Sequence, residues 1–241
     1  MRILILLLLF QSLVFSADFQ TRLSISLGPN ITFSTAKHSF YEQYNGFRVG
    51  GSKITINTLL AAGYNHRIKN DILKSISVLA ETGYNFSGYI RPTNGDFGNE
   101  GGIFFFHSLV LGLIPILNFY NNLSLGIGAG VMFPLSADID GYWDFMGYYK
   151  GVEKLSFNDI KKLYKFPVMP YVKISVERYF NLSDIIDMIV GGIISYNFGM
   201  SYEKDILSKA RYGLYPFSYE SYKFSAITLE VFIAVDFGRP K

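Results

Sequence analysis

The stretch FSAITLEVFIAVDF, residues 224–237, decides the fold of this chain. Its apolar side chains recur at every second position from Ile227 to Phe237, and most positions between them hold small or polar residues such as Thr228 and Glu230. Successive side chains of a β-strand point to opposite faces. The period of two therefore predicts a strand with one apolar face.

Similar alternation recurs along the chain. We predict β-strands at 22–34, 52–65, 75–90, 103–119, 123–136, 166–180, 187–202 and 224–237. Each is longer than the roughly 9–11 residues that cross a bilayer at a tilt. The stretch 103–119 is apolar on both faces, so its sequence does not determine which side chains share a face.

The links between the predicted strands alternate in length. Long links cover about 35–50, 91–102, 137–165 and 203–221, and short ones cover 66–74, 120–122 and 181–186. An even number of antiparallel strands, with short turns at one end and long loops at the other, is typical of an outer-membrane barrel. We therefore predict an all-β fold, an eight-stranded antiparallel up-and-down transmembrane β-barrel. A short amphipathic helix is expected within 154–165.

The first 16 residues predict a cleaved signal peptide, because Arg2 precedes an almost wholly apolar stretch and then small residues. At about a dozen residues, the apolar stretch is short of the roughly 20 that a membrane anchor needs. We expect cleavage after Ser16, which leaves 17–241 as one barrel domain with both termini in the periplasm. The chain has no cysteine, which excludes a disulfide framework and a lipid-modified cysteine.

A soluble eight-stranded barrel is the main alternative, since it would also alternate, with its apolar face inside. Its outer face would then carry many Lys and Glu. Here the polar faces carry mostly Ser, Gly, Asn, Thr and Ala, which suit a narrow interior. We therefore expect the apolar faces to contact outer-membrane lipid or lipopolysaccharide. Aromatic residues at strand ends are expected to form interfacial girdles: Phe119, Tyr120, Tyr179, Phe180, Tyr202, Tyr222 and Phe237.

With its alternating strands, unequal loops and terminal aromatic, the chain resembles the small eight-stranded outer-membrane proteins typified by the OmpA membrane domain, OmpX and OmpW. The resemblance implies insertion by the barrel-assembly machinery, which in that group reads the last strand and its final aromatic residue, here Phe237. Residues 238–241 follow Phe237, so the signal would be read with an offset. The formal net charge of +3 is too small to imply a nucleic-acid partner, and we expect no cofactor or metal.

Five charged residues on the polar faces of the predicted strands are candidates for a site in the lumen. Glu81, Lys173 and Glu230 are expected near mid-barrel, and Glu177 and Asp236 nearer the periplasmic end. Charges inside a barrel must pair or lose their charge. Two interpretations stay open: a salt-bridge network that fills the lumen, or a gate that rearranges to pass small ions, as OmpA-type interiors suggest.

The long loops are rich in aromatic residues, which are common anchors at interfaces. The candidates for partner contact are Tyr142, Trp143, Phe145, Tyr148 and Tyr149 in the third long loop and Tyr215, Phe217 and Tyr219 in the fourth. They favour a structural or adhesive role at the cell surface, with packing on the barrel rim as the alternative reading. An OmpW-like conduit for ions or small hydrophobic molecules is the second hypothesis.

Catalysis is the least favoured function. Lipid A deacylases, which are also small barrels, use a His-x-Ser pair, and the histidines of this chain do not match that spacing. Here Ser108 follows His107 directly, and adjacent strand residues point to opposite faces. We therefore expect no enzyme activity.

Overall fold

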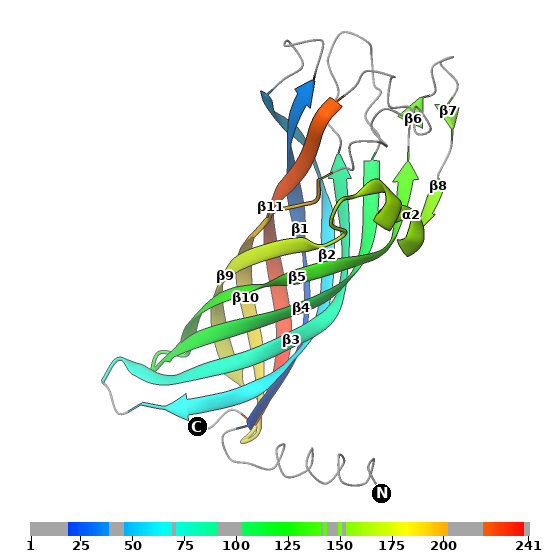
Figure 1. The fold of residues 1–241 in the computed structure, drawn as a ribbon. Helices are drawn as coiled ribbons and strands as arrows, with labels where there is room; N and C mark the ends of the chain where they lie inside the picture. Colours follow the sequence, from blue (N-terminus) through cyan, green and yellow to red (C-terminus); the bar gives the residue numbers. More distant parts are fainter. Residues whose placement is uncertain are drawn as a thin grey trace, which may run out of the picture.

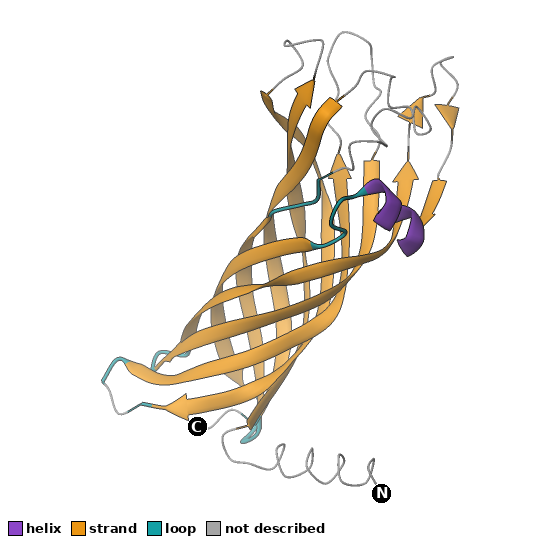
Figure 2. Ribbon diagram, viewed as in Figure 1, coloured by secondary structure: helices purple, strands orange, loops and turns teal. Residues whose placement is uncertain are grey.

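The computed structural model describes residues 19–38, 46–68, 71–90, 103–140, 142–143, 149–150, 153–201 and 219–238, and its strands close into a tilted antiparallel barrel (Figures 1 and 2). The wall consists of β1 (Phe19–His38), β2 (Gly46–Arg67), β3 (Leu73–Ile90), β4 (Ile103–Phe119), β5 (Leu123–Asp140), β9 (Met169–Asn181), β10 (Ile186–Asn197) and β11 (Tyr219–Phe237). Each of these strands pairs with the next. The predicted all-β, eight-stranded up-and-down barrel is confirmed.

Closure of the barrel depends on the last strand. β11 pairs with β10 on one side and with β1 on the other, where Ile25 lies opposite Ile233 and Ile31 lies opposite Ile227. A closed barrel has no free strand edge, so the backbone groups of its wall bond to one another. A lipid environment requires this, because it offers the backbone no other partner.

The β4 strand has the predicted bounds, and the structure now determines its faces. Phe106, Val110 and Ile114 point into the barrel and are buried, whereas Leu109 and Leu113 point outward and are exposed. Both faces are apolar because the inner one borders an apolar layer of the lumen, described below. Pairing with β3 and β5 sets this register, and the sequence of β4 alone does not contain it.

The prediction that a strand continues to Tyr202 is wrong. β10 ends at Asn197, and two residues later Gly199 adopts a φ of 65°, in the left-handed region that favours glycine. The turn breaks the alternation of faces. Continued alternation from Met188 would turn Met200 outward, but Met200 points inward and is 1% exposed.

Along one of its edges, β5 pairs with two strands in succession. Residues 123–132 pair with β9, and residues 136–139 pair with the short strand β8 (Glu153–Ser156). Helix α2 (Phe157–Leu163) lies between β8 and β9 in the chain, within the predicted helical segment. Ser156 caps it by exchanging hydrogen bonds with Asp159, and these bonds hold the pKa of the Asp159 carboxyl below its usual value. Among the described residues, no helix is long and apolar enough to span a membrane.

Two further short strands, β6 (Tyr142–Trp143) and β7 (Tyr149–Lys150), pair with each other beyond the wall. They belong to the predicted third long loop. The short links at the opposite end hold the turns near Ile72, Asn122 and Ser183. Phe19 and Gly238 lie at this short-turn end, where the Gly238 amide donates a hydrogen bond to the Ile185 carbonyl.

The outer surface of the wall is apolar. Side chains that point outward and are exposed include Leu23, Ile25, Leu27, Leu60, Leu113, Ile127, Ile174, Val176, Ile194, Val231 and Ile233. Tyr120, Phe180 and Phe237 are exposed at strand ends, in accordance with a girdle, but Tyr179 is only 2% exposed and points into the lumen. Its assignment to the girdle is therefore wrong. Tyr202 and the side chain of Tyr222 lie outside the described residues.

Candidate functional site

The lumen is the candidate site, and its layer nearest the short turns is built around Arg22 on β1. The guanidinium lies 3.0 Å from a carboxylate oxygen of Glu177 on β9 and 3.2 Å from one of Asp236 on β11. Arg22 also donates a hydrogen bond of 2.6 Å to the Tyr179 hydroxyl, and the Gln20 amide donates to Asp236. All five side chains are buried. One buried cation therefore bridges two carboxylates from different strands.

A second polar layer lies at mid-barrel. Lys173 on β9 donates to Glu81 on β3 at 2.6 Å, and the Tyr171 hydroxyl donates to the other oxygen of the same carboxylate. Since β4 and β5 stand between β3 and β9 in the wall, these contacts cross the lumen. A Cβ atom at Gly112 would lie 2.3 Å from the Tyr171 hydroxyl, so glycine leaves the room that Tyr171 occupies.

Glu230 on β11 belongs to the same layer and has different partners. Its carboxylate accepts hydrogen bonds from the Ser26 hydroxyl and, at 2.6 Å, from the Asn57 amide. The oxygen of the Asn57 side chain in turn accepts a bond of 2.7 Å from Asn85. Glu230 thus ends a chain of neutral donors that runs across β2 and β3.

The loop end of the lumen is filled by an apolar layer. Phe106 of β4 and Phe224 of β11 stack with ring centroids 5.9 Å apart, and Tyr164 contacts both at 6.3 and 6.1 Å. The cluster also contains Met200 and, from α2, buried Ile160 and Leu163; its other members are Leu59, Tyr89, Val110, Met132, Ala137, Leu155, Met169, Tyr171 and Ala226. Below the loops, side chains therefore occupy the described lumen at all three heights, with a small cavity of about 40 Å³ beside Lys173 and Glu230.

These observations identify the class of fold. Soluble barrels bury apolar side chains and expose charged ones. This wall does the opposite over most of its height, with apolar side chains outside and paired charges inside. The chain has the fold of an outer-membrane β-barrel. An outer-membrane barrel of eight strands has an interior that side chains can just fill, as they do here.

The sequence-predicted charges are all buried in the lumen, in two groups. Glu81, Lys173 and Glu230 lie at mid-barrel, and Glu177 and Asp236 lie nearer the short turns. The cation of the lower layer was missed. Arg22 stands two residues before Ser24 and four before Ser26, on the same polar face, so its spacing contained the signal.

The predicted loop contacts fall largely outside the described residues. Phe145, Tyr148, Tyr215 and Phe217 are not described, and Tyr142, Trp143, Tyr149 and Tyr219 are described only as strand backbone. The predicted assembly signal Phe237 is the last residue of β11 and points outward, with its ring partly exposed.

His107 lies on the outer face of β4, and its neighbours differ from those of a His-x-Ser pair. Ser108 points into the lumen and is buried. The Tyr84 hydroxyl bonds to one nitrogen of His107, and the other nitrogen lies 3.4 Å from the Asp138 carboxylate. The three side chains form a partly exposed polar row on a largely apolar face.

Comparison with known proteins supplies fold relatives only. No protein-family model matches the sequence, and no curated protein matches it. Similar solved structures include Ail, the attachment invasion locus protein of Yersinia pestis, at 11% identity and a TM-score of 0.39; neisserial surface protein A at 13% and 0.37; and OprG of Pseudomonas aeruginosa at 10% and 0.40. Each alignment covers 91% of this chain, and 99%, 97% and 95% of the others, respectively.

Proposed function

We propose that the protein resides in the outer membrane, with both termini in the periplasm, as a filled barrel that anchors its long loops for contact with a partner outside the cell. The observation that carries the proposal is the packed lumen. Ion pairs that cross the lumen and an apolar layer above them hold the strands together and occupy the described lumen at three heights. We therefore assign the binding function to the long loops, because binding residues usually lie on loops.

Surface exposure is tested by treating intact cells with trypsin. Lys150, Lys154, Lys161 and Lys162 lie in or beside the third long loop. We expect cleavage there without permeabilisation of the cells, and fragments that match the loop positions. Protection of these sites in intact cells, together with cleavage after permeabilisation, would contradict the proposed orientation.

Partner contact is tested by adherence of intact expressing cells to a host-cell monolayer. We expect a variant with Tyr142, Trp143, Phe145, Tyr148 and Tyr149 changed to Ser to adhere several-fold less than the wild type. The heat-modifiable band on a gel controls for folding. Equal adherence of a folded variant would remove the adhesive role of this loop.

A narrow conduit is the second candidate, favoured by a cavity of about 40 Å³ that Lys173 and Glu230 help to line. Leu59, Val110 and Met132 of the apolar layer line it on one side. In planar bilayers we therefore expect no stepwise conductance from the wild type or from Glu81→Ala. Conductance that appears in the wild type, and that Glu81→Ala alters, would favour the gate.

Catalysis is not part of the proposal. Should the barrel modify lipid, His107 with Tyr84 and Asp138 would be the place, since a hydrogen-bonded His and carboxylate can act as a general base. An assay of acyl release from lipopolysaccharide, with His107→Ala as control, tests this. We expect the same background release from both proteins.

A further inference from the structure

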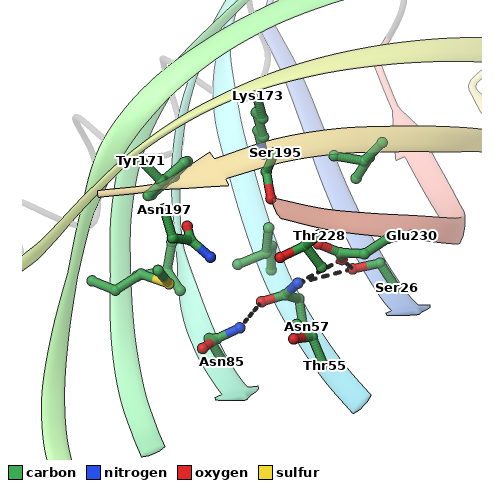
Figure 3. A pocket seen from close by; sticks show the side chains of 14 residues that line it. Ser26, Thr55, Asn57, Asn85, Tyr171, Lys173, Ser195, Asn197, Thr228 and Glu230 are labelled. Carbon is green, nitrogen blue, oxygen red and sulfur yellow. Dashed lines mark hydrogen bonds between the residues drawn. The ribbon is translucent and has the colours of Figure 1, made fainter. Parts of the chain in front are cut away.

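The cavity at mid-barrel, lined in part by Lys173 and Glu230, is not needed for the proposed anchoring of the loops, and it points to a second function. Its volume is about 40 Å³, and its lining combines apolar side chains with oxygen-bearing ones such as Ser195, Thr228 and Glu230 (Figure 3). A water molecule needs roughly 10–15 Å³ measured in this way, so the cavity has room for about three species of that size. The polar side chains in its lining offer hydrogen-bonding partners to species of that size.

Among the described residues, Glu230 on the cavity wall has no cation to itself, because the nearby Lys173 is bound to Glu81. Glu81 and Lys173 neutralise each other at 2.6 Å, so with Glu230 the layer sums to one negative charge. The partners of Glu230 are the neutral donors Ser26 and Asn57, both on the same oxygen. Among the described residues, no ion pair reaches Glu230. A buried carboxylate in this position is costly unless a proton or a cation joins it.

A second observation points into the same space. Thr228 is 1% exposed and lines the cavity, and its hydroxyl has no hydrogen-bond partner within the described part of the chain. Thr228 lies directly opposite Ser195 in the pairing of β10 with β11, and Glu230 follows it on the same face. Figure 3 shows the side-chain oxygens of Ser195, Thr228 and Glu230 turned toward one another. Neighbouring strand positions thus present three oxygen-bearing side chains to the same cavity.

We propose that this cavity binds a monovalent cation of about the size of Na⁺. Glu230 supplies the charged ligand, Thr228 and Ser195 supply neutral oxygens, and water completes the shell within the remaining volume. Hard cations prefer oxygen ligands of this kind. The single unbalanced carboxylate favours a charge of +1, since a divalent ion would leave the layer positive. Lys173 borders the cavity as well, but its ammonium group is bound to Glu81.

The test is the thermal unfolding of the refolded full chain in neutral detergent, followed by circular dichroism and by gel mobility. The chlorides of Li⁺, Na⁺, K⁺ and N-methylglucamine are compared at equal ionic strength, which cancels general screening. We expect a higher unfolding midpoint in at least one alkali chloride than in N-methylglucamine chloride, with a saturating dependence on the concentration of the ion. The organic cation serves as the reference because it is too large for the cavity.

Two variants and a control assign the effect to the site. Glu230→Gln should abolish the dependence on alkali cations, and Thr228→Val, which removes only a neutral ligand, should weaken the apparent affinity several-fold. Glu177→Gln, in the lower layer, should keep the dependence. An unfolding midpoint that is the same in all four salts would mean that Glu230 keeps a proton and that no cation binds. A dependence unchanged in both site variants would also overturn the proposal.

Discussion

At the scale of single residues, Arg22 contributes most clearly to the stability of the lumen. Its guanidinium joins Glu177 and Asp236, and all three are buried. Removing the cation leaves two carboxylates close together in a medium of low dielectric. We expect Arg22→Met to lower the free energy of unfolding by about 3–5 kcal/mol, measured by urea denaturation of the refolded barrel.

The matched control for this change is Arg178→Met. Arg178 is the sequence neighbour of Glu177, but it points outward and is exposed. Its loss should change the free energy of unfolding by no more than about 0.5 kcal/mol. The double variant Arg22→Met, Glu177→Gln should recover part of the stability, because it removes one of the two stranded charges. Equal losses in the two arginine variants would mean that the ion pairs of the lumen do not stabilise the barrel.

At the scale of elements, the end of β10 depends on Gly199. The φ of 65° costs a residue with a side chain about 1–2 kcal/mol, and a Cβ atom there would lie 1.6 Å from the Phe224 carbonyl oxygen. We expect Gly199→Ala to destabilise the barrel by at least about 2 kcal/mol in the same urea assay. The close contact is with backbone of β11, which moves only if the wall distorts.

Gly192→Ala is the control within the same element. A Cβ atom at Gly192 would have its nearest contact at 3.7 Å, and the position is exposed on the outer face. The change should be neutral or stabilise the barrel by up to about 1 kcal/mol, since it restricts the unfolded chain. A loss at Gly192 as large as that at Gly199 would mean that any Cβ in β10 is harmful and that the turn is not special.

The strands also show which features of the fold can be predicted from the sequence alone. Alternation predicts the strands of the barrel wall, because each strand contacts two different environments and its two faces carry different kinds of residue. It fails where the rule is broken by one backbone angle, as at Met200, or where both environments are apolar, as in β4. Alternation does not predict which side chains pair with each other across the lumen. Arg22 and Glu177 are separated by 155 positions, and closure of the barrel brings them together.

At the scale of the whole molecule, assembly and stability should depend on different residues. Phe237 ends the strand that closes the barrel, but its ring points outward at the short-turn end and contributes little to the packed lumen. If the assembly machinery reads this residue, Phe237→Ala will lower the folded fraction in the outer membrane several-fold. The heat-modifiable band in membrane fractions measures that fraction. Refolded in detergent, the same variant should differ from the wild type by about 0.5 kcal/mol or less.

Ile233→Ala distinguishes a specific signal from a general loss of apolar surface. Ile233 lies on the same outer face of β11, four residues before Phe237, and is more exposed than Phe237. We expect it to assemble as the wild type does. Similar assembly defects in both variants would assign the effect to lipid contact along β11. A defect of Phe237→Ala that persists in detergent refolding would assign it to stability, because the lumen and the closure of the barrel would then depend on the terminal ring.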